Sequence, residues 1–372
     1  MLSLSGCRRR QQRLLARMEE ERLDLFVTGN FRTAYYFTGS LAAADAPVIF
    51  AIRQDGRSVL VTPANQSAAA DELIVVETYS IDRVIDQPVR DAAVLFREDL
   101  LRQKGTVTRY GVERAATPGI VESALSDLYP NAGPHDASQI VLDLRKRKDE
   151  EEIDEIRRAL NLNAAAYRAA RNAIVEGRTE LDVFNDLQTA VVLEAGTFVP
   201  LAGDFAAGER AIRGGGPPTP RIIEKNDLYI LDLFPAPHVY FGDTCRTFAA
   251  SIPTDLQEEA WEIVTGAVRI GEEAVKPGVR ARDVYAAIKR HLDSFPIAEN
   301  SFWHHGGHGI GLHGHEAPRI IPGSDDVFEV GDVITLEPGI YTKALRGGIR
   351  LEDNYVVREH GLEKIFHFPT DL

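Results

Sequence analysis

Cysteine is scarce in this sequence, and Cys7 and Cys245 are the only two among 372 residues. Two cysteines cannot supply the disulfide framework of a small secreted domain, and such low usage is typical of a reducing compartment. Long apolar runs are also lacking, because no stretch reaches the ~18 residues that a membrane-spanning helix needs. Together these absences predict a cytoplasmic protein that does not cross a membrane.

Positive charge is in short supply as well. The sequence has 42 Lys and Arg against 56 Asp and Glu, which gives a formal net charge of -14. A surplus of negative charge repels phosphates and argues against a general nucleic-acid binder. The 44% of hydrophobic and 26% of charged residues are ordinary for a globular protein and exclude wholesale disorder. At ~150 residues per domain, the length predicts two to three domains.

Residues 1–144 have the pattern of a smaller α/β domain. Amphipathic spacing predicts helices at residues 8–23 and 91–104, and short apolar runs predict strands. The polar stretch Asn131–Ser138 is predicted to be a connector. A dense charge run, Arg145–Glu152, is expected to open a long helix at the domain boundary. The predicted strands are residues 23–27, 47–52, 58–62 and 73–77.

Residues 145–372 would form the second domain. They contain a weak internal sequence repeat, called the internal echo below. Gly177 and Gly278 are each followed, after four residues, by Asp-Val and an aromatic residue, at Asp182 and Asp283. Each aspartate falls near the expected start of a helix, where a carboxylate favours the helix dipole. Two similar halves predict a pseudo-symmetric domain with a site between them. The predicted fold class of the chain is α+β.

Two aspartates lie close together in strand-like sequence. Asp232 is inside the apolar run Tyr229–Phe234, and Asp243 follows a glycine eleven positions later. A buried carboxylate without a partner is costly, so an acid inside a strand needs a cation or hydrogen bonds. A hairpin would bring the two aspartates side by side, where a metal ion would neutralise both. The alternative is that Asp232 is an exposed residue of an edge strand.

Half of the ten histidines lie in one window of twelve residues, His304–His315. The glycines between them let several imidazoles approach a common centre. Such clustering favours a functional site over structural histidines. Farther along the chain, Glu337 and Glu352 each lie at the end of, or within, a β-like apolar run. An acid therefore occupies an apolar strand context four times in this half of the chain.

The four acids and one of the histidines make a carboxylate-rich set. Four negative charges balance two divalent cations, and oxygen ligands favour a hard ion such as Mn²⁺, although Co²⁺, Fe²⁺ and Zn²⁺ also fit. Two such ions close together lower the pKa of a bridging water and hold the reacting oxygens. The candidate ligands are Asp232, Asp243, His308, Glu337 and Glu352.

These residues lie in motifs that resemble the pita-bread dinuclear metallopeptidases, in the branch that holds aminopeptidase P and prolidase. Tyr36–Gly39 resembles part of that branch's smaller, creatinase/prolidase-like N-terminal domain, and Arg145–Glu152 resembles its linker helix. The resemblance implies a pseudo-symmetric pita-bread catalytic domain preceded by this smaller α/β domain. The matching stretches are Asp232 with Asp243–Thr247, Gly307–Leu312 with His315 and Glu316, Glu337–Tyr341 and Arg350–Asp353.

The resemblance also implies roles for the candidate ligands. Asp232 would bind one ion, and Asp243 and Glu352 would bridge both. His308 and Glu337 would hold the second ion, and Glu337 would also act as the general base.

Three further residues receive roles from the same resemblance. His315 would contact the substrate carbonyl and stabilise the oxyanion. His304 would assist proton delivery or contact the product. Arg350 would support the metal ligands from behind.

The sequence departs from the branch at one position. That branch normally carries another substrate-contacting histidine about 17 positions before the residue that corresponds to Asp232, where this chain has Gly215. Arg213 or Arg221 could replace it as a cationic anchor, or both could be solvated loop arginines. This departure leaves the metal chemistry intact but puts the substrate in question.

The leading hypothesis is a metal-dependent exopeptidase of the prolidase or aminopeptidase P type. It would cleave the Xaa-Pro bond of a small peptide, and the family resemblance implies a homodimer. One alternative keeps the hydrolytic centre but acts on another small amide or a cyclic amidine-like compound. A second alternative is a non-catalytic binding module on the same scaffold.

Overall fold

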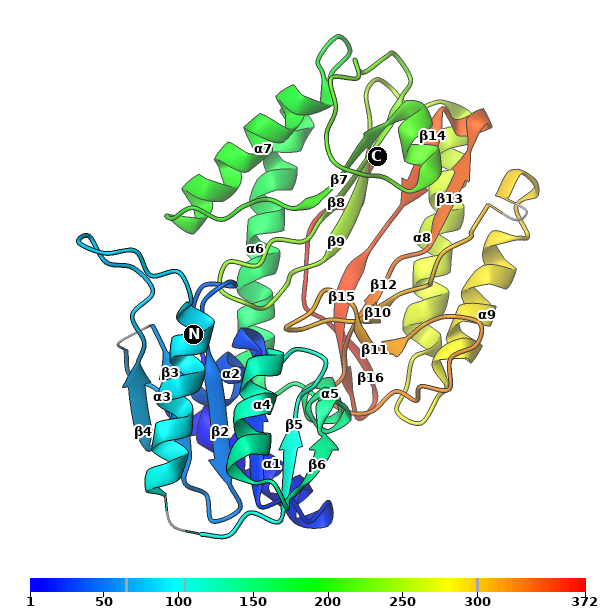
Figure 1. Ribbon diagram of the computed structural model, residues 1–372. Helices are drawn as coiled ribbons and strands as arrows, with labels where there is room; N and C mark the ends of the chain where they lie inside the picture. The colour runs from blue at the N-terminus through cyan, green and yellow to red at the C-terminus, as the bar shows by residue number, and fades with distance from the viewer. Residues whose placement is uncertain (64–65, 104, 299–300) are drawn as a thin grey trace. The chain divides into compact units, whose positions relative to one another are not determined.

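The computed structural model describes residues 1–63, 66–103, 105–298 and 301–372. The chain divides into two compact units, Met1–Arg145 and Lys146–Leu372 (Figure 1). Each unit has a hydrophobic core of its own. Across the described ranges, no helix has both the length and the apolarity that a membrane crossing requires.

The first unit is built on a mixed six-stranded sheet with the order β4-β3-β2-β1-β5-β6. Strand β2 runs antiparallel to β1 and β3, and the other neighbours are parallel. Phe96 of α3 and Leu125 of α4 pack on one face of the sheet. Because side chains alternate along a strand, Phe50 points to the other face, where it stacks on Phe37 of α2. The strands are β1 (Leu25–Thr28), β2 (Ile49–Arg53), β3 (Ser58–Thr62), β4 (Glu72–Val75), β5 (Arg109–Val112) and β6 (Gly133–Asp136). The helices are α1 (Leu4–Glu20), α2 (Phe31–Thr38), α3 (Pro88–Arg102), α4 (Gly119–Leu128) and α5 (Ser138–Lys146).

The predicted connector at Asn131–Ser138 is wrong, because it contains strand β6. Pro134 concealed this strand, since proline cannot donate a hydrogen bond to a sheet. Strand β6 lies at the edge of the sheet next to β5, and a missing donor is tolerated at an edge. The charge run also divides differently, because α5 ends at Lys146 and α6 begins at Glu150 behind a capping box.

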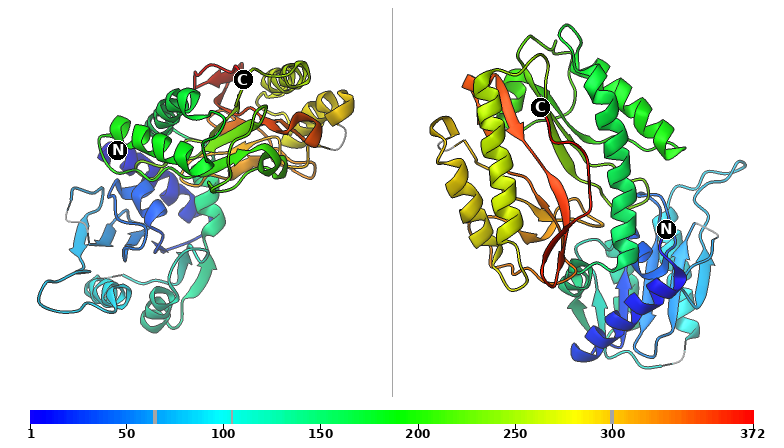
Figure 2. Two further views of the ribbon diagram at one scale, coloured as in Figure 1. Left: turned by 90° about the horizontal axis from the view of Figure 1, so that it is seen from above. Right: turned by 180° about the vertical axis from the view of Figure 1, so that it is seen from behind.

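The second unit combines long helices with small sheets. Its sheets have the orders β7-β8-β9 and β11-β10-β12-β15-β16, together with the hairpin β13-β14. The right-hand view of Figure 2 shows α6 and α8 lying across one face of these strands. The helices are α6 (Glu150–Ala173), α7 (Glu180–Ala195), α8 (Asp255–Ala274) and α9 (Ala281–Leu292), with short 3-10 turns at Gly208–Arg213, Pro296–Ala298 and Lys343–Leu345. The strands are β7 (Gly203–Ala207), β8 (Leu228–Leu233), β9 (Thr244–Ala249), β10 (His308–Gly309), β11 (Glu316–Arg319), β12 (Val333–Leu336), β13 (Gly339–Thr342), β14 (Gly347–Arg350), β15 (Asp353–Arg358) and β16 (Gly361–Lys364).

The internal echo occupies corresponding places in two helix pairs. Helix α6 packs on α7, and α8 packs on α9. Gly177 and Gly278 lie in the turn inside each pair, with φ values of 90° and 87° that glycine adopts without strain. Asp182 closes a capping box at the start of α7, and Asp283 lies in the first turn of α9. The prediction of a pseudo-symmetric second unit is confirmed.

Candidate metal centre

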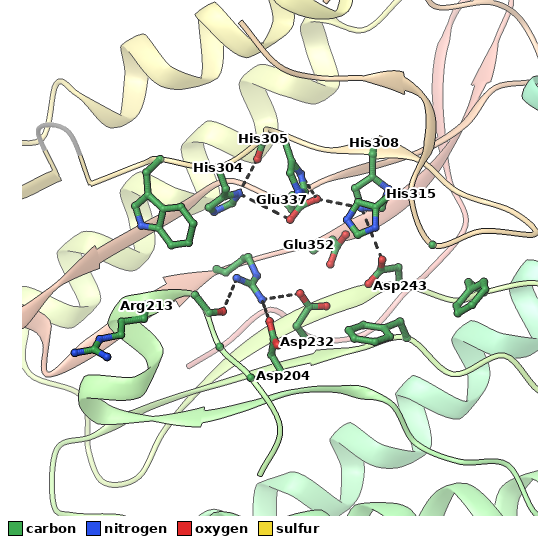
Figure 3. A pocket seen from close by; sticks show the side chains of 18 residues that line it. Asp204, Arg213, Asp232, Asp243, His304, His305, His308, His315, Glu337 and Glu352 are labelled. Carbon is green, nitrogen blue, oxygen red and sulfur yellow. Dashed lines mark hydrogen bonds and ion pairs between the residues drawn. The ribbon is translucent and has the colours of Figure 1, made fainter. Parts of the chain in front are cut away.

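A cavity of about 630 Å³ lies in the second unit. All eight residues that the sequence nominated for the site line it. Figure 3 shows the labelled acids and histidines arranged around one central space. The eight residues are Asp232, Asp243, His304, His308, His315, Glu337, Arg350 and Glu352. Motifs that are far apart in the sequence therefore converge on one place.

Strand pairing brings three carboxylates together. Strands β8 and β9 pair so that Asp232 lies opposite Cys245, and Asp243 comes directly before β9. Cys245 also bridges to Glu352, whose backbone N–H donates to the Cys245 carbonyl at 3.1 Å. The alternative of an exposed edge position for Asp232 is wrong, because β8 is the middle strand and Asp232 is 9% exposed.

His308 and Glu337 come from a second pair of neighbouring strands. His308 lies in β10, which pairs with β12, and Glu337 follows β12 directly. Nε2 of His308 is 3.3 Å from Oε1 of Glu337 and 3.7 Å from Oδ2 of Asp243. Nδ1 of the same ring is 2.9 Å from the Gly309 carbonyl oxygen. That contact orients the imidazole so that its other nitrogen faces the acids.

The cavity holds more buried negative charge than its hydrogen bonds compensate. Burial and the nearby Asp232 raise the pKa of Asp243 well above its ordinary value, and burial and Asp243 do the same to the pKa of Glu352. Within the described residues, Oδ1 of Asp232 and both carboxylate oxygens of Glu352 lack a hydrogen-bond partner. Buried acceptors in this condition are suited to binding cations.

Glu337 has a different environment from the other acids. Burial by itself would raise the pKa of Glu337, but the neighbouring imidazoles of His305 and His308 hold that pKa well below its ordinary range. Nδ1 of His305 is 3.0 Å from Oε1 of Glu337. The ligand atoms converge in two groups that could each hold a cation, Asp243 with His308 and Glu352, and His304 with His305 and Glu337. The donor set therefore fits divalent metal ions.

Two further predicted histidines line the same cavity. The ring centroid of His315 is 4.1 Å from that of His308, and Nε2 of His304 is 2.8 Å from the Tyr341 hydroxyl. Burial is the main cause that lowers the pKa of both His304 and His315 to about 4. Both imidazoles are then neutral at pH 7, and each retains one N–H that can donate a hydrogen bond.

Arg350 connects the acids to a neighbouring loop. Its Nη2 donates to Oδ2 of Asp232 at 2.6 Å and to Oδ2 of Asp204 at 3.0 Å. Its Nη1 donates to the Gly214 carbonyl at 2.9 Å and to the Tyr341 hydroxyl at 3.1 Å. With 5% exposure, this guanidinium is a buried cation that fixes the orientation of several groups at once.

Gly215, at the position of the expected histidine, also lines the cavity. Arg221 does not replace that histidine, because it pairs with Asp227 at 2.8 Å and lines a different hollow. Arg213 lines the cavity, but Figure 3 shows its guanidinium pointing away from the other labelled side chains. The side chain that lies against Gly215 is Asp204.

The cavity-lining residues that sequence reasoning did not nominate include Asp204, Trp303 and His305. Asp204 carried a usable signal, because it is an acid inside the apolar strand β7, which is the signal that identified the acid in β8. His305 belonged to the histidine cluster but had no motif of its own. Trp303 gave no signal beyond its position next to that cluster.

Comparison with known proteins identifies both units. The model of the Creatinase/Prolidase N-terminal domain matches residues 10–147, and the model of Metallopeptidase family M24 matches residues 154–359. The Xaa-Pro dipeptidase of Pyrococcus furiosus is 28% identical over 365 residues, which cover 98% of this chain and 99% of the relative.

Solved structures agree with the sequence matches. The Xaa-Pro dipeptidase from Bacillus anthracis superposes with a TM-score of 0.82 at 26% identity, over 98% of this chain and 99% of that one. The prolidase from Pyrococcus horikoshii has a TM-score of 0.83 at 24% identity, with the same coverage. The second unit matches over most of its length, and the chain therefore belongs to metallopeptidase family M24, whose enzymes depend on divalent metal ions.

Proposed function

We propose that this enzyme is an Xaa-Pro exopeptidase of the prolidase or aminopeptidase P type, which hydrolyses the amide bond before a proline. The observation that carries the proposal is the meeting of all five candidate ligands in one cavity, where buried carboxylate oxygens have no hydrogen-bond partner among the residues that the structure describes. Full-length relatives named Xaa-Pro dipeptidase support the choice of substrate.

In this proposal the carboxylate-rich set holds two divalent ions, and Mn²⁺ is the preferred ion because oxygen ligands dominate. When bound, such ions lower the pKa of water and stabilise negative charge that develops on oxygen. The residues that would hold them are Asp232, Asp243, His308, Glu337 and Glu352. A homodimer and a cytoplasmic location complete the proposal, and the acidic, cysteine-poor composition supports the second of these.

The other residues would act on the substrate and its protons. Glu337 would accept the proton of the attacking water, since its low pKa keeps the carboxylate ionised. His315, neutral at pH 7, would donate a hydrogen bond to the substrate carbonyl oxygen as it gains charge. His304 would assist proton delivery to the leaving nitrogen through its hydrogen bonds, or contact the product. Arg350 would hold Asp232 in place.

Hydrolysis of matched peptides tests the proposal directly. The purified protein is loaded with Mn²⁺ or Co²⁺ and offered Xaa-Pro dipeptides and Xaa-Pro-Xaa tripeptides. Release of proline from the dipeptides identifies a dipeptidase, and release of the first residue from the tripeptides identifies an aminopeptidase. Metal-loaded protein that cleaves neither series would overturn the proposal.

One observation favours a second candidate, a hydrolase of another small amide or a cyclic amidine-like compound. The expected substrate-contacting histidine is replaced by Gly215, and a carboxylate lies at that place in the cavity. Turnover of such compounds by protein that leaves every Xaa-Pro peptide intact would favour this candidate.

A further inference from the structure

The loop Gly214–Gly216 is shaped around two larger side chains. A Cβ atom on Gly215 would lie 2.3 Å from Cγ of Asp204, and one on Gly214 would lie 2.9 Å from Cη2 of Trp303. The φ values of Gly214 and Gly215 are 94° and 143°, a region that side chains other than glycine rarely adopt. The Phe205 N–H donates to the Gly216 carbonyl at 2.7 Å and closes the loop over β7. The glycines therefore leave room for an acid and an indole in the wall of the cavity.

Asp204 has capacity left for a ligand. Its Oδ2 accepts from Arg350 at 3.0 Å, while no hydrogen bond from the described residues engages its Oδ1. Its side chain is 29% exposed and lines the cavity. Arg350 also donates to Asp232 and is buried, with 5% exposure, in the lining of the same cavity. Asp204 thus presents a carboxylate oxygen to the cavity, and such an oxygen accepts hydrogen bonds but cannot donate one.

Trp303 adds an aromatic surface to the wall of the same cavity. Its side chain lines the cavity although the residue is 57% exposed. The ring centroid is 5.6 Å from that of Tyr341 and 5.5 Å from that of His304, which support the indole on its inner side. Trp303 and Asp204 lie against adjacent glycines of one loop and line the same cavity, and an aromatic face attracts ammonium and guanidinium groups.

We infer that Asp204 and Trp303 form a specificity-determining subsite for a positively charged group of the substrate. This inference rests on the proposed function and adds a preference that the function alone does not supply. A histidine at the corresponding place could donate a hydrogen bond to a substrate carboxylate. The negatively charged Asp204 repels a substrate carboxylate. The subsite therefore selects arginine or lysine, and rejects acidic residues, at one position of the peptide.

Charge-matched peptides test the subsite. Arginine, its neutral isostere citrulline, and glutamate are placed in turn at the first position of Xaa-Pro-Ala and at the third position of Ala-Pro-Xaa. At one of the two positions we expect kcat/KM to favour arginine over citrulline by about tenfold, and citrulline over glutamate by a similar factor. Rates that differ by less than twofold among the three residues at both positions would overturn the inference.

Single substitutions test whether Asp204 and Trp303 cause the preference for arginine. D204N keeps the shape and the acceptor for Arg350 but removes the charge, so the arginine-to-citrulline ratio is expected to fall below about threefold. A purely structural role for Asp204 would lower both rates together and leave the ratio unchanged. W303L is expected to reduce the ratio in part. R213Q serves as the matched control and is expected to keep the wild-type ratio, and a ratio lost in R213Q but retained in D204N would contradict the assignment.

Binding to the metal-free protein separates this inference from the proposed function. Calorimetric titration compares arginyl-prolinamide with citrullyl-prolinamide, and prolyl-argininamide with prolyl-citrullinamide. Tighter binding of an arginine compound, lost in D204N, supports the subsite even when no Xaa-Pro peptide is cleaved. Efficient cleavage without any charge preference leaves the proposed function standing and removes the subsite.

Discussion

At the scale of one residue, Glu352 shows the free-energy cost of burying a carboxylate in this site. It is 1% exposed, and within the described residues neither carboxylate oxygen has a hydrogen-bond partner. Burial and the nearby Asp243 raise the pKa of Glu352 well above its ordinary value. In the metal-free protein this residue works against folding, because either a charge is buried or a proton must be taken up at neutral pH.

Replacing this carboxylate is expected to have opposite effects with and without metal. In EDTA, E352Q should be more stable than the wild type by about 1–4 kcal/mol, because a poorly compensated buried acid is removed. With saturating Mn²⁺ the order should reverse, since only the wild type gains the full stabilisation of ligand binding. Thermal unfolding in both conditions measures this reversal. The exposed control E359Q should follow the wild type, and an unchanged order in the two conditions would contradict the explanation.

At the scale of elements, the long periodic patterns were predictable and the exceptions have physical causes. The echo at Gly177 and Gly278 identified the turns inside both helix pairs, because a glycine, a helix start and an acid recur there at fixed spacing. Strand β6 was missed because Pro134 is a poor strand residue except at a sheet edge, and edge position is set by tertiary structure.

In the site, too, residues set by local sequence pattern were predictable, and residues set by tertiary structure were not. Motif residues such as His308 and Glu337 were predictable, because their neighbours in the sequence form a pattern. Asp204 carried the signal of an acid inside an apolar strand, but its link to the site arises from pairing between β7 and β8, which places it opposite Asp232. The identity of the residue that lies against Gly215 depends on how a loop folds back over a strand, and no local pattern encodes that contact.

The turns inside the helix pairs allow a test of backbone strain. A Cβ on Gly177 or Gly278 would meet no atom within 4 Å, so an alanine there is penalised only by the positive φ. We expect G177A and G278A each to lower the free energy of unfolding by about 1–2 kcal/mol. Denaturant unfolding measures the change. Gly323 also has open space but no positive φ, so G323A should not be destabilised, and equal losses in all three variants would refute strain as the cause.

At the scale of the whole molecule, one buried acid outside the metal centre couples stability to pH. Asp332 is fully buried before β12, accepts a hydrogen bond from the Glu329 N–H at 2.9 Å, and lies 3.8 Å from Nζ of Lys146. Burial raises the pKa of Asp332 from 3.8 to about 6. The folded state therefore holds this proton at pH values where the unfolded state releases it.

The sign of this coupling follows from the two pKa values. Below pH ~4 the residue is protonated in both states, and its contribution is fully present. As the pH rises from 3.8 to about 6, the unfolded state ionises first, so about 3 kcal/mol of stability is lost. In D332N this loss should disappear from the pH profile of the unfolding free energy. The exposed control D325N should keep the wild-type profile, and a D332N profile with the same slope would contradict the account.

The proposed metal centre would draw its ligands from both halves of the second unit. Asp232 and Asp243 come from β8 and the start of β9, whereas His308, Glu337 and Glu352 come from strands that follow α8 and α9. A chain that has folded only one half cannot bind an ion with the full set. We therefore expect the site to form late on the folding pathway, after the slow closure of long loops. Bound metal should then slow unfolding while leaving the folding rate almost unchanged. The ions would therefore increase the kinetic stability of the folded protein.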